Sequence, residues 1–320
     1  MSSSTPPAIA ESSQATATPK KVINNQQIAR LQHRHAWIVN LFTFSGLGLA
    51  LALLWLDGPV GSIELGLFLG MALITNIGIV VGFHRHFTHR SFQATMPVRV
   101  ALAILGSMAA QGTLSFWVAL HRFHHEHSDT PQDPHSPCFD GERSLNGLRG
   151  FWHAYVGWTV KHPVPNPNYY ATDLMRDRAL VQINKLYLGW VALGLLIPAL
   201  LGGWWHGSWQ GAFYGFLWGG AVRMSLTHNL VWSITSLAHI VGNRPLKSSD
   251  RSTNNFWLAL PTLGDSWHNN HHAFPNAAIV GWHWWQLDPA GWLIRLLEQF
   301  GWVWDVKVPS DRAIAAKTLP

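Results

Sequence analysis

The sequence predicts an all-α membrane protein with four transmembrane helices in two hairpins, one interfacial helix and a cytosolic helical cap rich in histidine. Charged residues make up only 12% of the 320 residues, about half the ~25% typical of soluble domains. Hydrophobic residues reach 48%, and 19 residues are tryptophan. Three clusters of histidine each follow an apolar run, so metal-binding side chains lie next to the membrane.

The N-terminal part predicts a tail and then a helical hairpin. Residues 1–21 are rich in Ser, Thr, Ala and Pro and lack the apolar stretch of a signal peptide, so residues 1–36 are expected to form a disordered and juxtamembrane tail. Residues 37–56 are mostly apolar and reach ~30 Å as a helix. After a turn at Asp57-Gly-Pro59, residues 63–83 run back, so the tail and the first histidine cluster lie on the same side.

Residues 97–118 are also apolar and could be counted as a third span. If they crossed the membrane, the first and second histidine clusters would lie ~30 Å apart on opposite faces and could not share a metal centre. We therefore predict that this segment is a helix that lies in the membrane interface or dips into it.

Residues 186–205 and 209–232 predict a second hairpin, which returns the chain to the side of the histidines. The membrane domain is then residues 37–305, with a cytosolic cap at 119–185 and 236–305, and residues 306–320 form a C-terminal tail. The short loops near 57–62 and 203–208 contain no Lys or Arg, whereas the opposite segments contain many. By the positive-inside rule, we expect a multi-pass integral membrane protein whose active site and both termini are cytosolic.

The charge and cysteine content narrow the classes of partner and site. The net charge of +6 and the pI near 9.7 could indicate nucleic acid, but the basic residues flank apolar runs. Anionic membrane lipids or an acidic protein partner fit better, and no nucleic acid is expected. Because Cys138 is the single cysteine, intramolecular disulfides and cysteine-based zinc or iron–sulfur sites are excluded.

The histidine clusters have the spacing of metal ligands. On a helix, the spacing i, i+3, i+4 places three imidazoles on one stripe, where they can converge. Two clusters have it: His121, His124 and His125, and His268, His271 and His272. His84 and His89 are five residues apart, about 140° around an ideal helix, which suits a helix end or two neighbouring metals better than one metal on a regular face.

The ligand types favour two iron ions. No Glu is followed by His three places later, so the centre is all or nearly all histidine and differs from the Glu-x-x-His type. Eight clustered histidines exceed the needs of one metal and suit two. Zinc or copper would also accept imidazole, but hydrolytic zinc needs fewer ligands and a carboxylate base, so oxygen chemistry on iron is the better interpretation.

With these clusters and their flanking residues, the chain resembles the membrane fatty acid desaturase family, in its acyl-CoA or acyl-lipid Δ9 branch, which includes stearoyl-CoA desaturases. The resemblance covers roughly residues 37–300, and Trp284-Trp-Gln-Leu-Asp288 is similar to the bacterial members. The further matching segments are Thr88–Phe92, Ser128-Asp129, Asp133–Pro137, Arg149–Trp152, Gly157-Trp158, Ser236–His239 and Gly264–Pro275.

The resemblance implies four membrane helices under a cytosolic cap, with a histidine-bound di-iron centre (Fe2+/Fe3+). Such an enzyme uses O2 and electrons from an external donor, such as a ferredoxin or a cytochrome b5 type protein, to place a cis double bond in a saturated fatty acyl chain carried by CoA or a lipid. The resemblance gives as metal ligands His84, His89, His121, His124, His125, His239, His268, His271 and His272. It implies no catalytic residue beyond these ligands.

Two positions depart from the family pattern. Thr235 stands where relatives have the Asn of Asn-Ser-x-x-His, which holds one iron through water, and Tyr155 stands where relatives usually have His. We expect Thr235 and Asp265 to support the ligands from outside, with Asp129, Asp133 and Glu126 as further carboxylates that could orient ligand rings.

Other interpretations remain at this stage. A hydroxylase or other monooxygenase could be built on similar histidine clusters, and a divalent-metal transporter would need polar residues at mid-membrane depth, where the chain offers Thr75, Asn76 and Arg223. Arg223 either snorkels to the interface or acts near the metal or substrate. Phe68 is a candidate for the end of an acyl tunnel, although an aromatic residue at such a position more often faces lipid.

Overall fold

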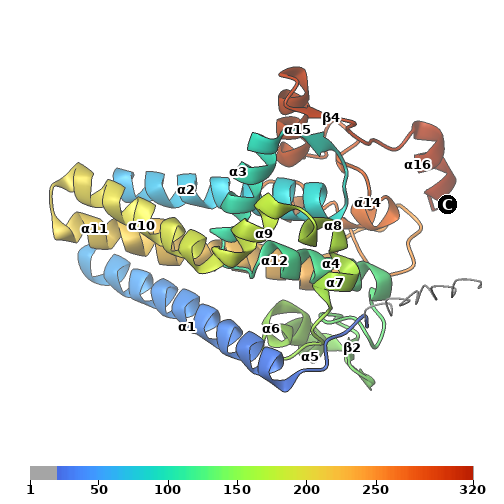
Figure 1. Cartoon of the computed structure of the whole chain (residues 1–320), viewed down its shortest axis with the longest axis horizontal. Helices are drawn as coiled ribbons and strands as arrows, with labels where there is room; N and C mark the ends of the chain where they lie inside the picture. Colours follow the sequence, from blue (N-terminus) through green and yellow to red (C-terminus); the bar gives the residue numbers. More distant parts are fainter. Residues whose placement is uncertain (1–19, 320) are drawn as a thin grey trace, which may run out of the picture.

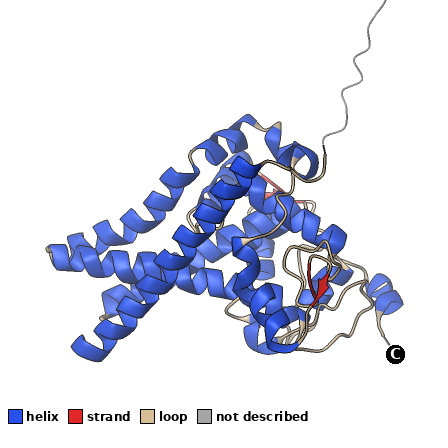
Figure 2. Ribbon diagram, turned by 90° about the horizontal axis from the view of Figure 1, so that it is seen from below, coloured by secondary structure: helices blue, strands red, loops and turns tan. Residues whose placement is uncertain are grey.

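The computed structural model describes residues 20–319, and helices dominate this part of the chain. The long helices extend to one end of the molecule, and the short elements gather at the other end (Figure 1). Strands form only two short pairs in the described residues, as Figure 2 shows. The expected disorder of residues 1–19 lies outside the described residues.

The first hairpin consists of α1 (Gln26–Asp57) and α2 (Ser62–Ile77), and α2 continues directly into the π-helix η1 (Gly78–Thr88). α1 begins at Gln26, within the predicted tail, because the Asn25 side chain caps it by accepting hydrogen bonds from Gln27 N and Ile28 N. The N-terminal half of α1 diverges from the other long helices (Figure 1).

The segment predicted as one interfacial helix at 97–118 is two helices, α3 (Met96–Ser107) and α4 (Leu114–His127). The backbone between them turns through Ala110 (φ 61°) and Gly112 (φ 98°), conformations that a continuous helix does not allow. Thr113 then caps α4 by accepting a hydrogen bond from Phe116 N. α4 therefore starts in a new direction and carries the second histidine cluster.

The second hairpin consists of α10 (Tyr187–His206) and a helical segment composed of α11 (Trp209–Gly215), the π-helix η3 (Phe216–Val222) and α12 (Arg223–Ser236). By length and composition, three helices can cross a membrane in the described residues: Gln26–Asp57, Ser62–Thr88 and Tyr187–His206.

Arg223 is fully buried and joins three backbone segments. It donates hydrogen bonds to Gly194 O (2.8 Å), Met108 O (3.0 Å) and Gly219 O (3.2 Å). Pro198 lies inside α10 and has no N–H to offer to Gly194 O, so the guanidinium supplies the missing donor. The side chain does not snorkel, because it is fully buried and bonded to these carbonyls.

The cap fills the other end of the molecule with short elements. Before the second hairpin these are β2 (Phe139–Asp140), β3 (Arg143–Ser144), α5 (Gly147–Trp152), η2 (His153–Gly157), α6 (Trp158–Val160), α7 (Pro167–Tyr170), α8 (Thr172–Met175) and α9 (Arg178–Lys185). After it follow η4 (Leu237–His239), α13 (Phe256–Ala259), α14 (His268–Ala273), α15 (Pro289–Gln299), β4 (Val303–Trp304) and α16 (Asp311–Lys317).

The last residues of the chain pack on the cap. β4 pairs antiparallel with β1 (Gln93–Ala94), with Ala94 opposite Val303. Leu319 N donates to Pro245 O, and Lys307 N donates to Ser91 O. The segment 306–319, predicted as a tail, therefore includes a helix and is held by backbone hydrogen bonds to the cap.

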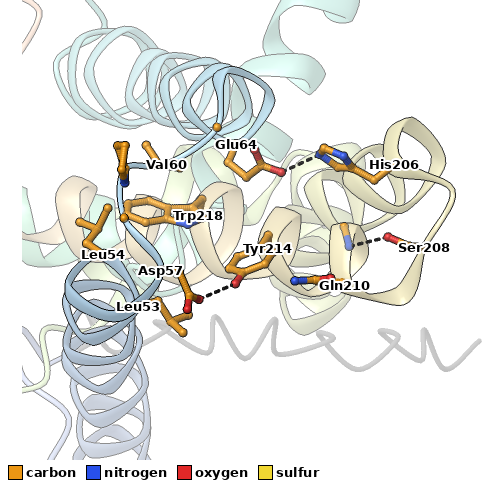
Figure 3. A pocket seen from close by; sticks show the side chains of 14 residues that line it. Leu53, Leu54, Asp57, Val60, Glu64, His206, Ser208, Gln210, Tyr214 and Trp218 are labelled. Carbon is orange, nitrogen blue, oxygen red and sulfur yellow. Dashed lines mark hydrogen bonds and ion pairs between the residues drawn. The ribbon is translucent and has the colours of Figure 1, made fainter.

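The turns of the two hairpins meet at the end of the molecule that lies far from α14 (Figures 1 and 3). A cavity of about 410 Å3 lies between them. Glu64 accepts a hydrogen bond from His206 (2.8 Å), and Tyr214 donates to Asp57 (3.0 Å), so polar contacts tie the two turns together (Figure 3).

Candidate metal centre

The structure gathers all nine predicted histidine ligands into two adjacent groups. Within each group, the nearest ring nitrogens all lie within 4.8 Å of one another. The first group, called the five-histidine group here, is His84, His89, His121, His125 and His271. The second, called the four-histidine group, is His124, His239, His268 and His272.

The π-helix η1 explains how His84 and His89 share one group. In this winding each turn holds more than four residues, so residues five apart lie on the same face. His89 N bonds to His84 O at 3.2 Å, and the two ring centroids are 4.9 Å apart. Of the two arrangements expected for this spacing, the structure has the helix end, because His89 is the residue that follows the last turn of η1.

The other two clusters are each divided between the groups. Residues i and i+4 differ by only about 40° around a helix, whereas i+3 and i+4 differ by about 100°. In α4, His121 and His125 therefore enter the five-histidine group and His124 the four-histidine group. In α14, His268 and His272 stay together in the four-histidine group, and His271 turns to the other.

The inner nitrogens have the spacing of ligands around a common ion. The Nε2 atom of His271 lies 3.0 Å from Nε2 of both His84 and His125, and His239 Nε2 lies 3.1 Å from His268 Nε2. Two neighbouring ligands at about 2.1 Å from a metal, at right angles, would be about 3.0 Å apart. The buried Nε2 atoms of His89, His124 and His272 have no hydrogen-bond partner in the described residues.

Carboxylates hold the outer nitrogens of four of these rings. The pairs, each from Nδ1 to a carboxylate oxygen, are His84–Asp265 (2.8 Å), His124–Asp133 (3.0 Å), His239–Asp129 (3.0 Å) and His272–Asp250 (2.7 Å). Such a partner keeps the proton on Nδ1 and leaves the Nε2 lone pair facing the interior of the group. The rings are therefore oriented for metal binding.

Asp265 belongs to a buried network. Arg85 is 1% exposed and donates to Asp265 (3.2 Å), to Asp288 (3.0 Å) and to Ala278 O (2.8 Å). The predicted residue Asp265 thus orients His84, from another part of the chain, and not His268, which follows it in sequence. The network joins η1 to the segment before α15.

The predicted supporting residue Thr235 lies beside the site but is engaged elsewhere. Its hydroxyl donates to Ala154 O (2.7 Å), and a second contact leads to Trp232 O (3.1 Å). Glu126 pairs with Lys21 and accepts from Tyr170, so it orients no ligand. Asp250 was missed, because it lies in a loop at no regular distance from any histidine cluster.

The electrostatics of the groups suits neutral imidazoles. Burial lowers the pKa of His121, His125 and His271 well below the ordinary value of 6.5, and repulsion between the neighbouring rings lowers it further. Neutral histidine is the form that binds metals. Burial alone would lower the pKa of His239, but the Asp129 carboxylate raises it above 6.5.

Two small cavities lead to the histidines. A cavity of about 50 Å3 lies against them and is lined by Ile79, Trp117, Leu230, Val231 and Thr235 among others. The next cavity, of about 120 Å3, shares Trp117, Val231 and Thr235 with it and extends between α1, α4 and α12. We call the two together the channel. Most of its wall is apolar, and Trp117 stacks on His121 with centroids 5.0 Å apart.

Comparison with known proteins gives the family. A family model described as fatty acid desaturase matches residues 62–306. Hex-5-enoyl-[acyl-carrier protein] acetylenase of Moorena producens is 50% identical over 307 residues, or 95% of each chain. Acyl-CoA C20 Delta5-desaturase of Anemone leveillei is 37% identical over 73% of this chain and 70% of that protein. An sn-1 stearoyl-lipid 9-desaturase of Synechocystis is 35% identical over 88% of this chain and 83% of that protein.

These matches confirm the resemblance that the histidine clusters indicate. The matched residues 62–306 include every member of both histidine groups. The chain belongs to the fatty acid desaturase family.

Proposed function

We propose that this protein is an O2-dependent di-iron desaturase that introduces a cis double bond into a saturated fatty acyl chain. The observation that carries the proposal is the pair of adjacent histidine groups at the inner end of an apolar channel. Unactivated methylenes have no acidic proton, so a general base cannot start the reaction and a metal–oxygen reaction is required. The all-imidazole donor set and its unpartnered Nε2 atoms fit two iron ions.

In this proposal one iron would be held by the five-histidine group and the other by the four-histidine group. When bound, the irons supply the activation of O2 and the oxidising power that removes two hydrogens from neighbouring carbons. The protein residues do the rest. Asp265, Asp133, Asp129 and Asp250 keep the ligand rings in one tautomer, and the burial of the groups excludes bulk water.

The channel would select which carbons react. An acyl chain is flexible and apolar, so a narrow channel fixes it by excluding water and restricting its path. Trp117 lines both parts of the channel and stacks on His121, which suits it to press the chain against the five-histidine group. Phe68 does not line the channel; it packs against Trp218 with centroids 6.5 Å apart, in the apolar cluster beside α1.

We further propose a topology of four spans. The helical segment from Trp209 to Ser236 runs beside α10 and would be the fourth span, with the buried Arg223 satisfied by backbone carbonyls. Two complete hairpins would bring the cap and the segment before α1 to the same side of the membrane. The distribution of Lys and Arg supports the cytosol as that side.

The position of the new bond is expected to be Δ9, on a chain bound to CoA, a lipid or another carrier, with electrons from a ferredoxin or a cytochrome b5 type donor. A second candidate is conversion of a double bond into a triple bond. It is favoured by the acetylenase of Moorena producens, which is 50% identical over 95% of this chain and is named for a substrate on an acyl-carrier protein.

Expression in a desaturase-deficient host, with product analysis by mass spectrometry and mapping of the new bond, tests these proposals. A monounsaturated chain supports the desaturase, an acetylenic chain supports the second candidate, and a hydroxylated chain would replace both with the hydroxylase.

Purified protein should contain two irons. His271→Ala should remove activity and lower iron content, whereas His283→Ala, an exposed residue outside both groups, should do neither. Full activity of the His271→Ala protein would overturn the assignment of the ligands.

A further inference from the structure

A basic groove lies at the outer end of the channel, between the first turns of α1 and the segment after α6. It has a volume of about 630 Å3 and contains three exposed cations, Arg30, Arg34 and Lys161. No carboxylate lines it, and none of these three side chains forms an ion pair with a carboxylate of residues 20–319. Arg30 and Arg34 are one helical turn apart, so they repel each other unless an anion lies between them.

The two walls of the groove are held together by hydrogen bonds. Ile23 N donates to Val164 O at 2.9 Å, and the His33 ring lies 3.0 Å from Val160 O through its Nδ1 atom. Deeper along α1, Asn40 donates to Thr159 Oγ1 at 2.9 Å. The convergence of cations from α1 and from residue 161 is therefore a built feature of the fold.

The groove borders the outer part of the channel. Gln32 and His162 line both the groove and the outer part of the channel, and their side chains contact each other at this junction. The outer part of the channel in turn shares Trp117 and His121 with the cavity at the histidines. Groove, junction and channel thus form one series of spaces that ends at the candidate irons.

The chemistry of this series specifies its ligand. The channel takes an apolar chain, and polar side chains line the junction, where an amide-bearing arm could hydrogen bond. The ligand of the groove should carry several negative charges spread over its surface, because the three cations are exposed and come from two walls. A small acidic protein matches this better than a single neutral lipid headgroup.

We propose that the groove is the docking surface for an acidic acyl carrier protein, whose phosphopantetheine arm passes Gln32 and His162 and presents the acyl chain to the channel. Arg30, Arg34 and Lys161 bind the phosphate and the acidic face of the carrier. This inference rests on the proposed function, because it assumes that the acyl chain reacts at the two histidine groups.

Binding tests the groove independently of turnover. The full-length holoenzyme in nanodiscs is titrated with an acyl carrier protein that bears a stearoyl group in non-reactive thioether linkage. Replacement by Gln of Arg30, Arg34 and Lys161 together should weaken binding about tenfold or more. Binding to the unaltered protein should also weaken as NaCl rises from ~10 to ~150 mM, since the Debye length falls from ~30 to ~8 Å.

Two matched variants guard against a folding defect. Arg30→Lys with Arg34→Lys keeps the charges and should retain binding within a few-fold. Replacement by Gln of Lys247, Arg295 and Arg312 removes three exposed cations of other surfaces and should leave carrier binding unchanged. Unchanged carrier binding in the groove variant would overturn the inference, as would an equal loss in the control variant.

Two further probes identify the source of the charge. If the groove variant loses binding of stearoyl-thioether coenzyme A as strongly as binding of the carrier, the groove serves a nucleotide-linked substrate and the inference fails. The inference also fails if the groove variant binds phosphatidylglycerol vesicles more weakly but binds the carrier as before. If an unsaturated product forms but carrier binding ignores the groove, the inference fails and the proposed function stands. If the carrier binds through the groove but no product forms, the groove remains a docking surface and the proposed function fails.

Discussion

Asp250 shows how a single carboxylate can orient a histidine of the candidate metal centre. It holds His272 Nδ1 at 2.7 Å and is itself fixed by Ser252 N at 2.9 Å. We expect Asp250→Ala to lower iron affinity or activity about 10–100-fold, because the His272 ring loses its preferred tautomer and orientation. Asp250→Asn, which keeps a hydrogen-bond acceptor, should lose less. Iron titration of both variants checks this, with the exposed Asp140→Ala as control; equal affinities in all three would contradict it.

Thr235 tests whether a side chain beside the histidine groups is needed for metal binding. Its hydroxyl donates a hydrogen bond to the carbonyl of Ala154. We expect Thr235→Val to retain two irons while the free energy of unfolding falls by about 1 kcal/mol, because the Ala154 carbonyl loses its donor. Iron content and thermal unfolding measure the two effects. Thr235→Ser should restore stability. Loss of one iron in the Val variant would instead assign the hydroxyl to metal binding.

For single residues, the clusters in the sequence indicated the histidines other than His239, which came from the family resemblance, but not their division into two groups. The pairing of His121 with His125, and of His268 with His272, follows from helix angles once both helices face the same space. Which carboxylate meets which ring depends on packing between distant segments. Asp250 had no pattern that could reveal it, and the sequence did not indicate that the ring supported by Asp265 is that of His84.

Among the elements, the contact between η1 and α3 depends on glycine. A Cβ at Gly78 would lie 2.1 Å from Gly106 N, so only glycine allows the two backbones to approach this closely. We expect Gly78→Ala to destabilise the protein by about 1–3 kcal/mol and to reduce iron content, because η1 carries His84 and His89. Thermal unfolding and iron analysis measure both effects.

Gly70→Ala is the matched control for this substitution. A Cβ there meets nothing within 4 Å, and alanine favours the helix, so this variant should be neutral or slightly more stable. If Gly78→Ala unfolds at the same temperature as Gly70→Ala, the close approach of α3 is not a structural requirement.

The positions of the long apolar helices could be predicted from hydropathy. The first two spans and α10 follow from long apolar runs. The break between α3 and α4 was missed, although Gly112-Thr113 is a turn followed by a helix cap. The π-winding of η1 has no comparable signal, because an apolar run gives the same hydropathy in a π-helix as in an α-helix.

For the whole molecule, the buried histidines predict a pH dependence of the metal-free protein. The pKa values of His121, His125, His268, His271 and His272 are held well below 6.5 by burial and mutual repulsion. Below pH ~6.5 these histidines bind protons in the unfolded chain but stay neutral in the folded chain. The free energy of unfolding is therefore highest above that pH and falls as the pH decreases. The loss is about 1.4 kcal/mol per pH unit for each histidine that is protonated only in the unfolded chain.

Thermal unfolding of the metal-free protein between pH 8 and about pH 5 measures this loss. Iron-loaded protein should resist the same decrease, because bound metal competes with protons for the ring nitrogens. An unfolding temperature that rises on acidification of the metal-free protein would contradict the burial of neutral imidazoles.

The topology was inferred from one geometric requirement, that three histidine clusters meet. That requirement excluded a membrane crossing at 97–118, and the structure brings the clusters together. Sequence alone could not place the channel or the basic groove, since both arise where α1 lies against segments more than a hundred residues later.

The division of α4 and α14 between the two histidine groups has a consequence for how the protein matures. Each helix supplies histidines to both groups, so neither group is complete before the two helices have met. If the groups hold iron as proposed, loading of both sites would require the folded cap, and the metal content of a preparation should follow the fraction of fully folded chains.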